Sequence, residues 1–338
     1  MAEQWNGIVV RCDMGEQCMV PRNALANSPD IVVAGTTPFP DPGILTDPRN
    51  YDRVFDGGLQ IGLPNYLYVR GKNAVANDLS GNWNLFWAEP NILLYPYLWA
   101  NNGIATSSGS RNPRFTIRAG AIGATTDPFT WVPPDYAAHS CLVAIANTPG
   151  HGNPMQGVND ITSLASVLAL NANIAQRNVQ TIHGNLPQVV FQSRYDQGAE
   201  PALVDLSIVF ENIPKGSSYT TSSAVPLNGR VLSHSDANTI DNNFKYAWVG
   251  LEIPAQWNTL FTCAVTFGRD WSGIPAGQKP KITIRADLIQ QSGQRLYDLG
   301  IELAPHPWNG QPRLDRSGGP IRAVTAGSFG IICPDVGP

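Results

Sequence analysis

The chain is poor in charge. Only 14% of its 338 residues are charged, and 22 Lys and Arg stand against 26 Asp and Glu, which gives a net charge of −4. Globular proteins usually carry about 25% charged residues, so the polar surface has to be built from Asn, Gln, Ser, Thr and the backbone. No block of Lys or Arg occurs. The basic footprint of nucleic-acid binding is therefore missing, and we expect no nucleic-acid partner.

Long apolar runs are also missing. No segment approaches the roughly 18 apolar residues that a membrane span requires. The first residues, MAEQWNGIVVRC, lack the basic and apolar regions of a signal peptide. We expect a chain without a transmembrane segment. Its location stays open between the cytoplasm and export by a route that needs no signal.

Catalytic and metal-binding motifs are absent as well. None of the five histidines has HxH, HExxH or HxxxH spacing, and no GxSxG elbow occurs. The glycine-rich loop 150–157 lacks the GK[ST] of a phosphate-binding loop. We therefore expect a non-enzymatic protein without a cofactor. An enzyme whose residues converge from distant loops is an alternative.

Five cysteines are present, and an odd number leaves at least one without an intramolecular partner. Cys141 and Cys263 lie in apolar, strand-like segments, which predicts two buried free thiols. A disulfide between Cys12 and Cys18, or between either of them and Cys333, stays open.

What the chain has in abundance is glycine and proline. The 32 glycines and 28 prolines indicate many turns between short strands. The predicted fold is all-β, with two immunoglobulin-like antiparallel β-sandwich domains in tandem and one short helix in the first. The predicted division is an irregular lead-in (1–46), a first sandwich (47–185), a second sandwich (186–312) and a tail (313–338).

Hydrophobic periodicity predicts the elements of the first sandwich. Segments 64–72 and 82–88 alternate like half-buried strands joined by a polar turn, and 139–147 is a continuous apolar strand. Residues 159–170 have helical spacing, with Asn159 or Asp160 as the N-cap. In the second half, strand-like segments are separated by polar segments expected to be loops, among them 217–223 and 236–243.

Residues 47–183 resemble the immunoglobulin-like modules of the CARDB type found in bacterial extracellular and cell-surface proteins. The resemblance is carried by NYLYVRGKNAV, LFWAEP, the loop at Trp131, HSCLVAIANTP and NANIAQRNVQTI. It implies a binding, spacing or adhesion module. The second half resembles no family that we can name.

Aromatic residues in predicted loops are the candidate binding residues, because Trp and Tyr on loops can stack on sugars or anchor a protein partner. These residues are Tyr95, Tyr97, Trp99, Phe129, Trp131, Trp271 and Trp308. The alternatives are that they cap the sandwich ends, fill the space between domains or form a subunit interface.

A second candidate site is a calcium site at Asp236, Asn238 and Asp241, because Ca²⁺ prefers carboxylate and amide oxygens. The alternative is a hydrogen-bonded turn, in which the neighbouring His234 would also lie.

These features together favour a bacterial β-sandwich protein that acts by binding or assembly. Its partner would be a carbohydrate, a protein or copies of itself. A secreted β-rich toxin is the alternative, suggested by the Ser/Thr-rich segment 216–224, which would suit a membrane hairpin.

Overall fold

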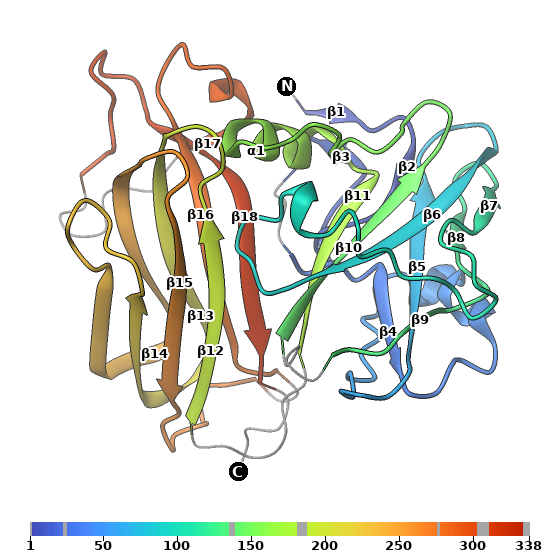
Figure 1. Ribbon diagram of the computed structural model, residues 1–338, viewed down its shortest axis with the longest axis horizontal. Coiled ribbons are helices and arrows are strands. Elements are labelled where there is room, and N and C mark those ends of the chain that lie inside the picture. Colours follow the sequence, from blue (N-terminus) through green and yellow to red (C-terminus); the bar gives the residue numbers. More distant parts are fainter. Residues whose placement is uncertain are drawn as a thin grey trace. The chain divides into compact units, whose positions relative to one another are not determined.

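The computed structural model describes residues 2–22, 26–134, 139–180, 188–275, 278–302 and 311–333, without the side chains of 180 and 237–242. Within these residues the chain forms antiparallel sheets and one α-helix, which confirms the all-β prediction (Figure 1). The strands are β1 (Glu3–Gln4), β2 (Ile8–Val9), β3 (Met19–Val20), β4 (Ile31–Gly35), β5 (Asn65–Asn73), β6 (Leu79–Ala88), β7 (Arg114–Ile117), β8 (Ile122–Ala124), β9 (Phe129–Trp131), β10 (His139–Asn147), β11 (Ile174–Gln180), β12 (Gln188–Asp196), β13 (Ala202–Ser223), β14 (Ser233–Ile253), β15 (Asn258–Thr266), β16 (Lys281–Gln290), β17 (Ile301–Glu302) and β18 (Arg322–Ile332). The helices are α1 (Ile161–Leu170) and the 3₁₀ turns η1 (Pro42–Leu45), η2 (Pro48–Asn50), η3 (Pro96–Leu98) and η4 (Tyr297–Leu299).

The chain divides into two compact units that are not simply consecutive. Unit 1 consists of Met1–Glu89, Leu94–Val158 and Val167–Thr181, and unit 2 of Pro90–Leu93, Asn159–Ser166 and Ile182–Pro338. The predicted lead-in therefore belongs to unit 1, where β2 and β4 pair with β5. The predicted tail contributes β18, which pairs with β16 in unit 2.

Unit 1 is a β-sandwich. One sheet has β5 at its centre, paired with β2 and β4 on one side and β8 and β9 on the other. The second sheet has the order β11-β10-β6-β7. One apolar cluster contains residues of both sheets, including Leu67 and Val69 of β5 and Trp83 and Leu85 of β6. Apolar residues two apart on each strand face this core because successive side chains in a strand alternate between its faces.

The structure corrects the predicted pairing of β5 and β6. Both segments are strands, as the alternation indicated, but they belong to different sheets and contribute to the core from opposite sides. The polar segment between them is therefore not a hairpin turn; it carries the chain from one sheet to the other. Alternation identifies a half-buried strand but does not identify its partner.

Two other elements of this half form where the sequence predicted them. β10 is buried along almost its whole length, as its continuous apolar sequence indicated. α1 begins at Ile161, and the Asp160 carboxylate accepts a hydrogen bond from the Ser163 amide at 2.8 Å, as expected for an N-cap. Residues 161–166 of α1 belong to unit 2 and 167–170 to unit 1, so the helix is not confined to the first domain.

Unit 2 is a sheet that folds over on itself in the manner of a sandwich. The strand order is β12-β15-β13-β16-β18-β17, with β14 on the other side of β13. The rings of Phe191 in β12 and Phe329 in β18 approach to 6.2 Å between centroids, although β15, β13 and β16 lie between these strands in the sheet. Such an approach requires strong curvature. The bend falls within β13, whose pairing with β14 is irregular between Glu211 and Tyr219.

Two segments that the sequence analysis placed in loops are parts of long strands. Residues 217–223 lie in β13 and residues 236–243 in β14 (Figure 1). The first part of β13 pairs with β16 and its last part pairs with β15, so β13 connects the two ends of the curved sheet. This Ser/Thr-rich segment has one buried face, which consists of Ser217, Tyr219 and Thr221. Polar composition alone led to the wrong expectation of a loop.

All five cysteines are free, so the disulfide alternatives do not occur in this structure. Cys141 and Cys263 are buried in β10 and β15, as predicted. Burial raises the pKa of the Cys12 thiol to about 12. No helix in the described part of the chain combines the length and apolarity needed to cross a membrane.

Candidate functional site

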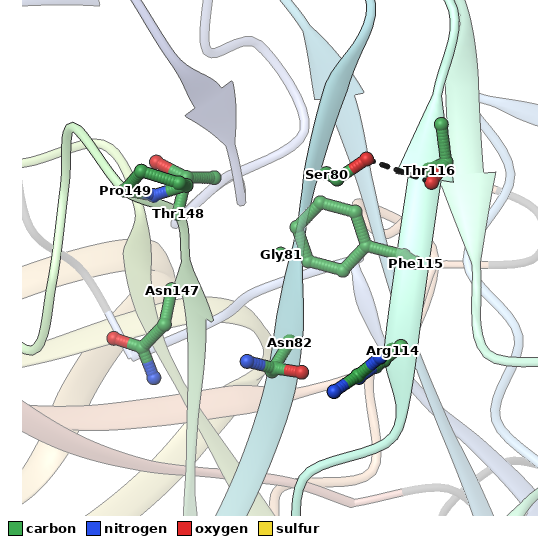
Figure 2. Close-up of a pocket in the computed structure, with 9 residues that line it drawn as sticks. All are labelled: Ser80, Gly81, Asn82, Arg114, Phe115, Thr116, Asn147, Thr148 and Pro149. Atoms are coloured by element: carbon green, nitrogen blue, oxygen red, sulfur yellow. Dashed lines mark hydrogen bonds between the residues drawn. The ribbon is translucent and has the colours of Figure 1, made fainter.

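A pocket of about 730 Å³ lies on unit 1, at the ends of three neighbouring strands (Figure 2). It is open to solvent, and strands β6 and β7 and the end of β10 supply its walls. The lining residues are Ser80, Gly81, Asn82, Arg114, Phe115, Thr116, Asn147, Thr148 and Pro149.

Strand register brings the polar side chains of the pocket together. Asn82 of β6 is paired directly with Asn147 of β10 on one side and with Arg114 of β7 on the other. Residues directly opposite one another in antiparallel strands share a face, and Figure 2 shows these three side chains in one row across the strands. Trp83, the next residue in β6, is in the core. The polar row therefore lies on the face turned away from the core.

Gly81 is essential to the shape of the pocket. A Cβ atom at this position would lie 2.1 Å from the carbonyl oxygen of Asn147 and 2.7 Å from Cζ of Phe115. The Phe115 ring is buried and lies 4.5 Å from the Trp83 ring between centroids. Because the missing side chain lets the Phe115 ring and β10 approach β6 closely, any larger residue would separate them.

Hydrogen bonds orient the pocket's side chains. The hydroxyl groups of Ser80 and Thr116 are 2.8 Å apart (Figure 2). Nδ2 of Asn147 donates to Oδ1 of Asn84 at 2.5 Å, and Nδ2 of Asn84 donates to the Arg111 carbonyl at 3.1 Å. These two hydrogen bonds fix the orientation of the Asn147 amide. Its Oδ1 is buried and accepts no hydrogen bond from the described residues. A buried acceptor without a partner costs about 1–3 kcal/mol.

The lining of the pocket is mostly polar and uncharged. Its nine lining residues include one cation, Arg114, and no Asp, Glu, His or Cys. Arg114 is exposed and forms no ion pair with any described residue. Amides, hydroxyl groups and a guanidinium can hold a polar ligand in a fixed orientation. The lining supplies neither a general base with a nucleophile nor a set of metal ligands.

Most of the aromatic residues proposed from the sequence are buried. Tyr95, Trp99, Phe129 and Trp131 are each at most 6% exposed. Trp99 packs on Phe86 and donates from Nε1 to the Leu94 carbonyl at 3.0 Å, whereas Phe129 and Trp131 belong to the core of unit 1. Side chains this buried have no surface for a ligand, so the packing alternative applies to these four residues.

The other three aromatic candidates do not form a common site. Tyr97 is 54% exposed and stacks on Tyr95 in unit 1. Trp271 is partly exposed and lies 6.4 Å from Phe267 between ring centroids in unit 2. Trp308 lies outside the described residues.

The calcium candidates lie on a strand. Asp236, Asn238 and Asp241 all belong to β14, so the turn that was the alternative to a calcium site does not form there. The side chains of Asn238 and Asp241 are outside the described part of the structure. Among the residues described, no three His, Cys, Asp or Glu side chains are grouped closely enough to hold a metal ion. The calcium site stays a prediction.

His234 lies in an aromatic cluster of unit 2 that the sequence analysis did not foresee. Its Nδ1 is 2.7 Å from the Tyr219 hydroxyl, and its ring lies 3.6 Å from that of Tyr246 between centroids. Burial lowers the pKa of His234, although the nearby Asp236 acts in the opposite direction. Tyr219 also packs on Phe210. Tyr219 is buried in this cluster, whereas His234 and Tyr246 are partly exposed.

The polar pocket was missed because no local motif marks it. Asn82 and Asn84 on the outer face of β6 were a visible signal, since they alternate with the buried residues of that strand. Arg114 and Asn147 come from segments far away in the sequence, and only the sheet order β10-β6-β7 places them beside Asn82.

Comparison with known proteins adds little to this description. No protein-family model matches the chain, and no curated protein matches its sequence. Red sea bream transglutaminase is 12% identical over 68% of this chain and 27% of its own, with a TM-score of 0.21. The calcium-binding domain CBD12 of CALX1.1 is 9% identical over 65% of this chain and 73% of its own, with a TM-score of 0.19. Allantoicase is 12% identical over 60% of this chain and 78% of its own, with a TM-score of 0.18.

The chain thus spans about a quarter of the transglutaminase chain, 27%. At these TM-scores the similarities carry no argument about function. The resemblance to CARDB-type modules stays a prediction from the sequence.

Proposed function

We propose that this chain is a non-enzymatic binding protein and that the pocket on β6, β7 and β10 takes a carbohydrate. The observation that carries the proposal is the row of Asn147, Asn82 and Arg114 across three paired strands. Sugar hydroxyl groups donate and accept hydrogen bonds, and amide and hydroxyl side chains do the same. A rigid sheet face holds such groups in register more precisely than loops would.

The size and lining of the pocket support a ligand of this class. Its volume of about 730 Å³ falls in the usual range of about 300–1,000 Å³ for small-molecule sites. Protein-binding hot spots are instead rich in accessible Trp, Tyr and Arg. The one aromatic residue in the lining, Phe115, is only 8% exposed. A polar, hydroxyl-rich ligand therefore suits this pocket better than a protein partner.

Titration calorimetry against a panel of oligosaccharides tests the proposal. We expect binding to at least one of them, and at least a tenfold loss of affinity in Asn82→Ala, because this substitution removes the central amide of the row and about 1.4 kcal/mol corresponds to tenfold. Asn101→Ala is the matched control, since Asn101 is exposed in unit 1 and outside the pocket. Absence of binding to the whole panel at millimolar concentration would refute the proposal.

Self-association is a second candidate, favoured by a different observation. β14 is 21 residues long, and in the described structure it pairs only with β13. A long free edge can pair with another chain. Its irregular register opposes regular pairing, so we rank this candidate below carbohydrate binding. Light scattering after size-exclusion chromatography tests self-association. A monomer at all concentrations would refute this candidate.

The toxin alternative has no comparable support. The segment 216–224 that suggested it lies almost entirely within β13, where Ser218–Ser223 pair with β15. A segment already paired in a sheet gives no reason to expect a membrane hairpin.

A further inference from the structure

We infer that the ligand of this pocket is an acidic carbohydrate, bearing carboxylate or sulfate groups that lie along the open edge of β7. This inference rests on the proposed function and adds the charge of the ligand to it. Three arginines carry it: Arg111, Arg114 and Arg118.

The segment of the chain that contains β7 carries charge of one sign. Residues 90–126 contain these three arginines and no Lys, Asp or Glu, in a chain whose net charge is −4. All three arginines are exposed. None of them forms an ion pair with any residue that the structure describes. Unpaired guanidinium groups are well suited to carboxylate and sulfate, which they can bind through two parallel hydrogen bonds.

The position of the arginines suits an elongated ligand. β7 is the last strand of its sheet and pairs with β6 alone among the described strands. Arg114 begins β7 and lines the pocket, whereas Arg111 and Arg118 lie just before and just after the strand. At about 3.3 Å per extended residue, Arg114 and Arg118 are separated along β7 by roughly 13 Å. A chain of several sugar units could reach from the pocket to a second arginine.

The nearby carboxylates are held by other groups. Asp78 accepts a hydrogen bond from the Ala119 amide at 3.0 Å, next to Arg118. Asp127 accepts from the Ser108 hydroxyl at 2.5 Å and from the Ser108 amide at 3.1 Å. Asp78 lowers the positive potential at Arg118 more than at the other two arginines, so we assign the main contact to Arg114 and the second to Arg111.

An acidic sugar fits this site better than a nucleic acid. Single strands are usually held by bases stacked on exposed aromatic side chains. The only aromatic residue of the pocket, Phe115, is buried under Gly81 and has no face free for a base. The amides and hydroxyl groups of the pocket match sugar hydroxyl groups, which adds specificity to the charge.

The test compares two ligands with the same sugar backbone, one charged and one neutral. A hexamer of galacturonic acid and its fully methyl-esterified form are titrated into the full chain at 50 and 200 mM salt, with a single-stranded oligonucleotide as a third ligand. We expect the acid to bind at least tenfold more tightly than the ester, and its affinity to fall with salt. Arg114→Gln should weaken binding of the acid about tenfold, and should weaken binding of the ester by a smaller factor. Arg230→Gln, at an exposed arginine of unit 2, is the control.

The outcomes separate the two proposals. Equal binding of acid and ester, unaffected by Arg114→Gln, would overturn the inference and leave carbohydrate binding intact. Tighter binding of the oligonucleotide than of the acid would also overturn it. Binding of no sugar here or in the wider panel would overturn both proposals. Unfolding curves of each variant show whether a loss of affinity comes from the site or from loss of the fold.

Discussion

Replacing Gly81 with alanine should destabilise unit 1 and close the pocket. The added Cβ would lie 2.1 Å from the Asn147 carbonyl oxygen and 2.7 Å from Cζ of Phe115. The first contact is with backbone, so side-chain rotation cannot relieve it, and β6 and β10 must move apart. Overpacking of this kind costs about 1–3 kcal/mol, and a backbone clash belongs at the upper end. Replacing a glycine in a strand with alanine by itself stabilises the folded chain by about 0.5–1 kcal/mol.

The net loss is therefore about 2 kcal/mol, or roughly 30-fold in the ratio of folded to unfolded molecules. Urea unfolding measures it, and hydrogen exchange in peptides covering 79–88 shows whether β6 is the part affected. Gly150→Ala is the matched control, because a Cβ there has no atom within 4 Å. We expect that control to be neutral or slightly stabilising. If Gly81→Ala were as stable as Gly150→Ala, the close approach of β6, β10 and Phe115 would be incorrect.

Three further outcomes follow from buried groups. Asp30→Asn should cost about 3–5 kcal/mol of unfolding free energy, because the fully buried Asp30 carboxylate is shared by Arg11 at 2.8 Å and Arg70 at 2.9 Å; wild-type stability in urea would contradict this. Stability should fall as the pH drops from 7 to 5, because burial lowers the pKa of His234 in the folded chain and the unfolded chain is therefore protonated at this histidine first, at about pH 6.5. His234→Gln should lose less stability over this range. A variant with the same pH profile as the wild type would contradict this prediction. Iodoacetamide followed by mass spectrometry should label Cys18 first, because it alone of the five cysteines is only partly buried; equally fast labelling of the other four would show that they are accessible.

The sequence and the structure agree best where the information is local. The continuous apolar segment 139–147 is a buried strand, and Asp160 caps the helix that follows it. The alternation in 82–88 indicated a half-buried strand, and Trp83 and Leu85 of this strand, β6, are in the core. Each of these features is decided by a few neighbouring residues, through the periods of the helix and the strand and through capping.

The expectations that were wrong concern features that are not local. The Ser/Thr-rich segment 217–223 looked like a loop, yet it is a strand because β14 and β15 pair with it from both sides. Trp99 and Trp131 looked like loop aromatics available to a ligand, yet the surrounding chain buries them. The composition of a segment gives its polarity, whereas its burial depends on which other parts of the chain pack against it.

The sequence by itself determined the all-β class and most of the strands, because side-chain alternation is a property of the strand alone. Only the tertiary structure decided which strands are neighbours. It separated β5 from β6 into two sheets and aligned Asn147, Asn82 and Arg114 in one row. Strand order and register depend on the combined burial of segments distant in sequence. The pocket exists only because this order and register bring its residues together.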